Sequence, residues 1–295
     1  MTYIVATFYK FVQISNIEAK RNQLLAFCQE KEIKGTILLA QEGINGTIAG
    51  ERNAIAATLD FLHSIPGLTD LESKESMAQT PPFSRMKIKI KQEIVTLGIP
   101  EVNPTQQVGT YVDPLDWNQV ISDPEVVVID TRNDYEVKVG SFRGAKNPQT
   151  DSFREFPEYV ADNLDPNQHP KVAMFCTGGI RCEKASSYLL SQGFKEVYHL
   201  KGGILKYLEQ VPPEASMWEG ECFVFDQRVA VKEKLESGTY DLCYACGHPI
   251  SEADKNSPQY EPSISCPNCC DQLTPAKKAR QEERRRQRAN KQETD

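Results

Sequence analysis

The side chains with the clearest chemical potential stand in one short stretch, residues 172–186, whose sequence is VAMFCTGGIRCEKAS. Its apolar start predicts a buried strand that leads directly into Cys176. Gly178 and Gly179 permit a tight loop with converging N–H groups, and the helical pattern that follows places a positive dipole end at this loop. Such a setting, with Arg181 beside the sulfur, lowers a thiol pKa from ~8.5 to about 3.5–7.5. The stretch therefore predicts a reactive thiolate at Cys176.

Cys176 has several roles open to it. An inert buried cysteine is disfavoured, because the glycines, the arginine and the helix start all favour the ionised sulfur. A phosphatase would need a C-x5-R loop, whereas Cys176 to Arg181 is C-x4-R, a spacing better suited to one sulfur atom than to a phosphate. Sulfur transfer remains open, with Cys176 attacking a donor and passing the sulfur on as a persulfide. Cys182 could resolve an oxidised Cys176, or it could simply pack in the first turn of the helix.

The predicted catalytic residues are Cys176, Arg181 and Cys182, with Arg181 and loop amides stabilising negative charge on the sulfur. The residues that shape the loop itself are Thr177, Gly178, Gly179 and Ile180. We expect Asp130 and Arg132 to brace this loop rather than to react, whereas Arg143 is open to either role.

Two C-x-x-C pairs near the C-terminus predict a second site. They are Cys243/Cys246 and Cys266/Cys269, with nineteen residues between the pairs. This spacing is typical of a structural zinc site of the ribbon type. Reduced thiols in a small module without metal are the alternative, and Cys270 or His248 could replace a ligand.

Basic residues form two clusters in an otherwise acidic chain. The formal net charge is −7, but residues 276–295 carry +4 and residues 1–275 carry −11. Seven of the eight basic side chains of this tail are candidate contacts: Lys277, Lys278, Arg280, Arg284, Arg285, Arg286 and Arg288. The other cluster is Arg85, Lys87, Lys89 and Lys91, which fall on one face of a predicted strand. Either cluster could contact a phosphate backbone, and a solvated strand edge and a solvated tail are the alternatives.

The elements before the reactive stretch predict a ferredoxin-like sandwich, βαββαβ, over residues 1–97. We expect strands over residues 2–9, 35–40, 47–49 and 85–97, helices over 16–31 and 52–63, and a turn over 42–46. Residues 98–113 contain prolines and are predicted to be a linker. The fold class is therefore α+β at the start of the chain.

The rest of the chain is predicted to hold one larger and one smaller unit. Residues 114–213 alternate strands with helices, which predicts a parallel α/β sheet with Cys176 beyond the C-terminal end of a central strand. Residues 214–275 predict a small Cys-rich module, and residues 276–295 a basic tail, helical to about 290.

Composition excludes several classes of protein. No run of about 18 apolar residues is present, so no membrane span is expected. The start of the sequence lacks a basic region and a cleavage site, so we expect no signal peptide and a cytoplasmic location. Nine cysteines placed singly or in C-x-x-C pairs indicate metal or redox chemistry rather than a disulfide framework. The sequence carries no signal for an oligomeric state.

The loop around Cys176 resembles the active-site loop of rhodanese domains, where the cysteine carries a persulfide. The flanking motifs agree: residues 126–136 and 140–147 resemble the aspartate–arginine strand and the glycine–alanine–asparagine turn of that family, and residues 197–203 resemble its last strand and double-glycine turn. Ser141 stands where many relatives have His. Together with residues 41–47, residues 82–87 and the cysteine pairs, nearly the whole chain resembles bacterial rhodanese-domain proteins that hydroxylate uridine 34 in the tRNA anticodon.

This resemblance implies an acylphosphatase-like first domain, a tRNA partner, and an oxygen-dependent conversion of uridine to 5-hydroxyuridine, with oxygen as co-substrate. The residues themselves show no matching oxygen-activating group. The four histidines form no H-x-D or H-x-E pair for a non-haem iron, and no G-x-G-x-x-G is present for a flavin or nicotinamide. The alternatives are a rhodanese-type sulfurtransferase that passes persulfide sulfur to tRNA or a protein, and an RNA-binding scaffold that delivers or senses sulfur.

Overall fold

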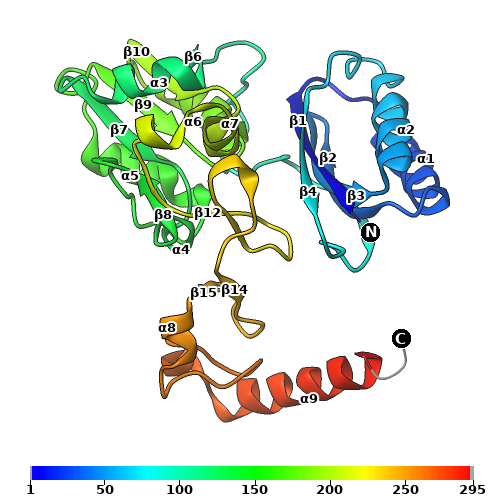
Figure 1. Cartoon of the computed structure of the whole chain (residues 1–295). Coiled ribbons are helices and arrows are strands. Elements are labelled where there is room, and N and C mark those ends of the chain that lie inside the picture. Colours follow the sequence, from blue (N-terminus) through cyan, green and yellow to red (C-terminus); the bar gives the residue numbers. More distant parts are fainter. Residues whose placement is uncertain (1, 293–295) are drawn as a thin grey trace.

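The computed structural model describes the backbone of residues 2–292 and the side chains of residues 2–287. Figure 1 shows three parts in chain order: a blue-to-cyan N-terminal domain, a green-to-yellow central domain, and an orange-to-red C-terminal part that ends in a long helix. No helix in the described part of the chain is long and apolar enough to cross a membrane.

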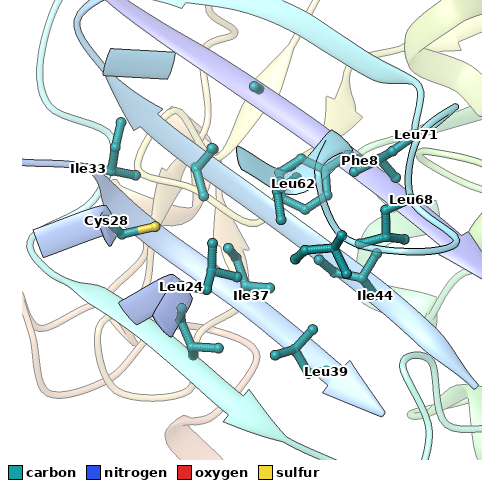
Figure 2. Close-up of a cluster of buried hydrophobic side chains, with 14 of the residues drawn as sticks. Phe8, Leu24, Cys28, Ile33, Ile37, Leu39, Ile44, Leu62, Leu68 and Leu71 are labelled. Atoms are coloured by element: carbon teal, nitrogen blue, oxygen red, sulfur yellow. The ribbon is translucent and has the colours of Figure 1, made fainter. Parts of the chain in front are cut away.

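The N-terminal domain is one five-stranded sheet with order β4-β1-β3-β2-β5 and two helices. Its elements are β1 (Tyr3–Phe11), α1 (Ile17–Glu30), β2 (Lys34–Ala40), β3 (Gly43–Gly50), α2 (Arg52–His63), β4 (Ser73–Ala78) and β5 (Met86–Ile90). Alternate side chains of the strands meet the apolar stripes of the helices in one core, where Phe8, Leu24 and Ile37 lie together (Figure 2). The first four strands have the predicted ferredoxin-like order.

Two sequence predictions for this domain need correction. Strand β4 (Ser73–Ala78) was not predicted, and it takes the place beside β1 that the sequence assigns to residues 85–97. Of that segment only Met86–Ile90 is a strand, and it adds a parallel edge to β2. The predicted turn over 42–46 is a turn only at its start, because Gly43 to Gly46 pair with both β1 and β2.

The central domain is a four-stranded parallel sheet with order β6-β10-β9-β7. Its strands are β6 (Thr110–Val112), β7 (Val126–Asp130), β9 (Lys171–Phe175) and β10 (Glu196–Leu200), with the short β8 (Gly140–Phe142) outside the sheet. Its helices are α3 (Pro114–Ile121), α4 (Asp134–Val137), α5 (Phe156–Asn163), α6 (Ile180–Ser191) and α7 (Gly203–Gln210). As predicted, the chain leaves central strand β9 directly at Cys176.

The central domain extends beyond the limits expected from the sequence. Strand β6 lies inside the expected linker, and β11 (Trp218–Gly220) pairs with β8 although it lies in the expected Cys-rich module. Trp218, Cys222 and Val231 fill the same core as Phe175, because they cover an apolar face that the sheet and its helices leave open.

The C-terminal part is small and loop-rich, as predicted. After β12 (Cys222–Phe223) and β13 (Ala230–Val231) it consists of β14 (Asp241–Leu242), β15 (Pro249–Ile250), α8 (Glu252–Lys255) and α9 (Pro275–Gln292). Its core is small, with Ile250 and the buried Cys243 and Cys266 at its centre, which is little apolar packing for an independent unit.

Candidate active site and metal centre

Cys176 lies in a tight loop between β9 and α6. The helix begins at Ile180, and Gly179 at φ 104° aims its N–H at the Cys176 sulfur, 3.1 Å away. Gly203 packs directly against this loop. A Cβ at position 203 would lie 2.5 Å from the Cys176 carbonyl oxygen, so only glycine fits there. The Thr177 hydroxyl is buried with no hydrogen-bond partner among the described residues. The loop thus closes tightly around the sulfur.

The surroundings favour a thiolate at Cys176. Burial opposes ionisation, but the Cys182 thiol, the Arg181 charge and the amides of Gly179 and Cys182 outweigh it and lower the pKa of Cys176 to about 6. Burial and the neighbouring Cys176 sulfur raise the pKa of Cys182 well above its ordinary value. Cys182 is therefore the protonated donor of the pair and Cys176 is the anion.

Arg181 acts on the sulfur while paired with a carboxylate. Its guanidinium forms two hydrogen bonds to Glu136, of 2.8 and 3.0 Å, and lies over the ring of Phe225. The sequence interpretation did not include Glu136, which is fully buried on α4 and belongs to its capping box with Asn133. This bidentate pair fixes the orientation of the arginine beside the loop.

Asp130 and Arg132 form a buried ion pair that joins the end of β7 to β8, and that they brace the Cys176 loop stays a prediction. Arg132 donates to Asp130 at 2.6 and 2.8 Å and to the Gly140 carbonyl at 2.6 Å, and both side chains are fully buried. Ser141 donates to the same aspartate at 2.8 Å. Arg143, in contrast, forms an exposed ion pair with Glu219 at 2.9 Å.

The N-terminal domain covers the reactive loop, which the sequence did not reveal. Lys74 on β4 donates to the carbonyls of Gly178 and Gly202, at 2.7 and 2.6 Å. Tyr9 on β1 donates to Glu183 on α6 at 2.7 Å. Beneath this cover Cys176 is only 1% exposed. Burial lowers the pKa of Lys74 to about 8, although the nearby Cys176 charge acts in the opposite direction.

A second contact joins the domains beside the loop. Lys184 on α6, which is 1% exposed, forms ion pairs with Glu42 and Glu93. Both carboxylates also accept backbone N–H groups, from Ile94 for Glu42 and from Leu97 for Glu93. The helix that follows Cys176 is thereby fixed to the N-terminal domain at both Glu183 and Lys184.

The four cysteines predicted as metal ligands converge. The sulfurs of Cys243, Cys246, Cys266 and Cys269 all lie within 4.8 Å of one another, a set that could hold a metal ion. Neither alternative ligand belongs to this cluster: the ring of His248 stacks on Tyr135 at 4.8 Å, and Cys270 contacts the Pro267 carbonyl.

The two basic clusters are on the surface. Arg85, Lys89 and Lys91 are exposed and Lys87 is half-buried along edge strand β5, and none of them forms an ion pair within the described part of the chain. Helix α9 carries Lys277, Lys278, Arg280, Arg284, Arg285 and Arg286, all exposed. Lys278 and Arg285 contact Glu261 at 3.4 Å, and the side chain of Arg288 lies outside the described residues.

The parallel sheet with a thiolate loop at the start of α6 defines a rhodanese-type domain. The model of the rhodanese-like domain matches residues 114–210, and that of the UPF0176 acylphosphatase-like domain matches residues 3–94. A protein of Picosynechococcus sp., named tRNA uridine(34) hydroxylase, is 60% identical over 97% of this chain and 96% of its own. A protein of the same name from Teredinibacter turnerae is 59% identical over 97% of this chain and 89% of its own. The chain belongs to the family of these proteins.

Proposed function

We propose that this protein is an enzyme that hydroxylates uridine 34 of tRNA to 5-hydroxyuridine. The observation that supports this most is the pair of full-length relatives at about 60% identity that carry this name. The loop agrees with covalent chemistry, because it surrounds Cys176 with an arginine, a thiol donor and backbone amides.

In this proposal Cys176 is the reactive group and acts through its sulfur anion. Arg181 and the Gly179 amide stabilise the charge on that sulfur. Cys182, which donates to it in the resting state, is placed to resolve an oxidised Cys176. Asp130 and Arg132 act through the backbone that they brace.

The remaining predicted sites support RNA binding and stability. Four converging cysteines, with two of them buried, suit a structural Zn²⁺ bound through thiolates. The exposed cations of β5 and α9 suit the phosphate backbone of the tRNA body. Among residues 2–287 no hydrogen bond or ion pair joins either set to the loop at Cys176, so both would act through binding and folding.

A complementation experiment tests the function. A strain lacking the gene receives the wild-type chain, Cys176→Ala or Cys28→Ala, and tRNA nucleosides are measured by mass spectrometry. Cys28 is the matched control, because it is a fully buried cysteine whose pKa is raised to about 12 by burial in the N-terminal core.

We expect 5-hydroxyuridine with wild type and Cys28→Ala, and none with Cys176→Ala. An unchanged amount of 5-hydroxyuridine with Cys176→Ala would refute the proposed catalytic role of the Cys176 sulfur. Loss of a thiolated base, with 5-hydroxyuridine unchanged, would indicate sulfur transfer instead.

A further inference from the structure

An open pocket of about 500 Å³ lies between the two large domains. Strand β1 and residue 74 of β4 line it from the N-terminal domain, and β6, α6 and the residues after β10 line it from the central domain. The volume is in the range of about 300–1,000 Å³ that is usual for small-ligand sites. It has room for one nucleotide but not for a duplex.

The pocket shares its wall with the reactive loop. Lys74, which lines it, donates to the carbonyls of Gly178 and Gly202 beside Cys176. Tyr9 and Glu183, which are bonded to each other, line it as well, and a Cβ at Gly179 would lie 2.8 Å from the Tyr9 hydroxyl. A molecule in the pocket is therefore separated from the sulfur only by this layer of contacts.

Aromatic and polar groups in the pocket match the chemistry of a pyrimidine. Tyr111 is 45% exposed there and offers a ring face for stacking. The edge of uracil presents acceptor, donor and acceptor groups. The wall offers a Lys74 ammonium with one proton left after its two carbonyl contacts, which suits one of these acceptors, and the Glu183 carboxylate, which suits the N–H donor. The Tyr9 hydroxyl already donates to Glu183 and can accept only.

The rim of the pocket provides positive charge on the central domain. Lys206 is half-buried and forms no ion pair within residues 2–287, and Lys201 is 45% exposed at 3.4 Å from Asp113. Lysines at a rim suit the phosphate that flanks a base held inside. Lys10, the further lysine of the pocket, is already paired with Asp70.

We propose that this pocket receives the pyrimidine nucleotide to be modified, turned out of a single-stranded RNA loop, with its base against Tyr111 and its phosphate at Lys206. The proposal rests on the function proposed above and assigns its substrate site. Enzymes that act on a base in RNA take it out of the stack into such a pocket, and unpaired anticodon-loop bases are the cheapest to extrude. Contact with Cys176 then requires Lys74 to leave the loop carbonyls.

The test uses the full-length protein and an anticodon stem-loop RNA with 5-iodouridine at position 34. Irradiation cross-links this base to aromatic side chains, and mass spectrometry identifies the peptide. We expect the cross-link on the peptides that carry Tyr111 or Tyr9. Cross-links confined to β5 or α9 would overturn the proposal.

Binding and product formation are measured with Lys206→Glu, Tyr111→Ala and a matched control, Lys195→Glu. Lys195 is an exposed lysine immediately before β10, at the opposite end of the strand from Lys201. We expect each pocket variant to weaken stem-loop binding about tenfold, and Lys206→Glu to reduce the salt slope by about one. The control should bind like wild type.

The outcomes separate this proposal from the function on which it rests. If wild type forms 5-hydroxyuridine and the pocket variants bind and react like Lys195→Glu, the pocket is not the substrate site although the function holds. If wild type forms none, the function itself fails. Circular dichroism of each variant identifies one that merely fails to fold, and the cross-link on unaltered protein then decides.

Discussion

Replacing Lys184 should test whether the buried charges between the domains hold them together. Lys184→Met leaves Glu42 and Glu93 facing each other with their counter-charge removed. These carboxylates are 24% and 13% exposed, and backbone N–H groups keep them in place. Breaking a buried ion pair from one side costs about 3–5 kcal/mol. We expect a loss of this size in the free energy of unfolding.

The measurement is urea unfolding at neutral pH, followed by circular dichroism, with Lys171→Met as the matched control. Lys171 also pairs with two carboxylates, Glu125 at 2.7 Å and Asp123 at 3.5 Å, but at the surface. An exposed pair contributes about 0–1 kcal/mol. Equal destabilisation by the two variants would refute the reasoning.

The pH dependence provides a second readout of the same contact. Burial raises the pKa of Glu93, but the Lys184 ammonium and two amides outweigh it, so the folded pKa lies below the ordinary value. The stabilisation is therefore complete above the unfolded pKa of about 4.3 and is lost as the pH falls through the folded pKa. Lys184→Met should lose this acid-side dependence, and adding Glu93→Gln should recover part of the stability.

Three further predictions concern the sulfur sites and the brace. Alkylation of Cys176 by a small reagent should be slow, because the sulfur is 1% exposed beneath Lys74 and Tyr9, but its rate should rise through about pH 6 and then level off, because the pKa is lowered and the thiolate is the reactive form. Cys28 should stay unlabelled at neutral pH, and a Cys176 rate still climbing at pH 8 would contradict the lowered pKa. Elemental analysis should find one zinc per chain in the wild type. The Cys246→Ser variant should lose this zinc without a change in Cys176 alkylation, and a wild type without metal would exclude a zinc site at the four cysteines. Arg132→Met should lower the free energy of unfolding in urea by about 3–5 kcal/mol, because Asp130 is left charged and fully buried. A loss below about 1 kcal/mol would show that the Asp130–Arg132 ion pair contributes little to stability.

The parts of the structure that depend on local sequence could be predicted. The loop at Cys176 follows from a strand, two glycines and a helix start within fifteen residues, and the cysteine cluster follows from two short spacings. Helix α2 has the predicted bounds because an apolar stripe and Pro66-Gly67 define both of its ends.

The elements and contacts that the sequence did not predict have no recognisable pattern in the residues around them. Strand β4, with sequence SKESMA, begins with four polar residues, and only Ala78 in it is buried, so neither periodicity nor hydropathy indicates a strand. It forms because β1 offers an unpaired edge. From the sequence one would therefore expect Lys74 to be exposed to solvent, although its ammonium donates to the carbonyl of Gly178, 104 residues later in the chain. The pairing of Arg181 with Glu136 was hidden for the same reason.

These distant contacts change what the rhodanese-type domain can be expected to do. A thiolate loop that stood alone would face solvent, whereas here Lys74 and Tyr9 of the first domain cover it and Cys176 is 1% exposed. Burial and the Cys176 charge act on the pKa of Lys74 in opposite directions, so the cover and the sulfur are electrostatically linked. In the proposed complex the phosphate lies at Lys206, and the base must displace Lys74 from the loop carbonyls before it reaches the sulfur. The central domain without the first domain would therefore keep Cys176 in its loop but lose the Lys74 and Tyr9 contacts that cover it.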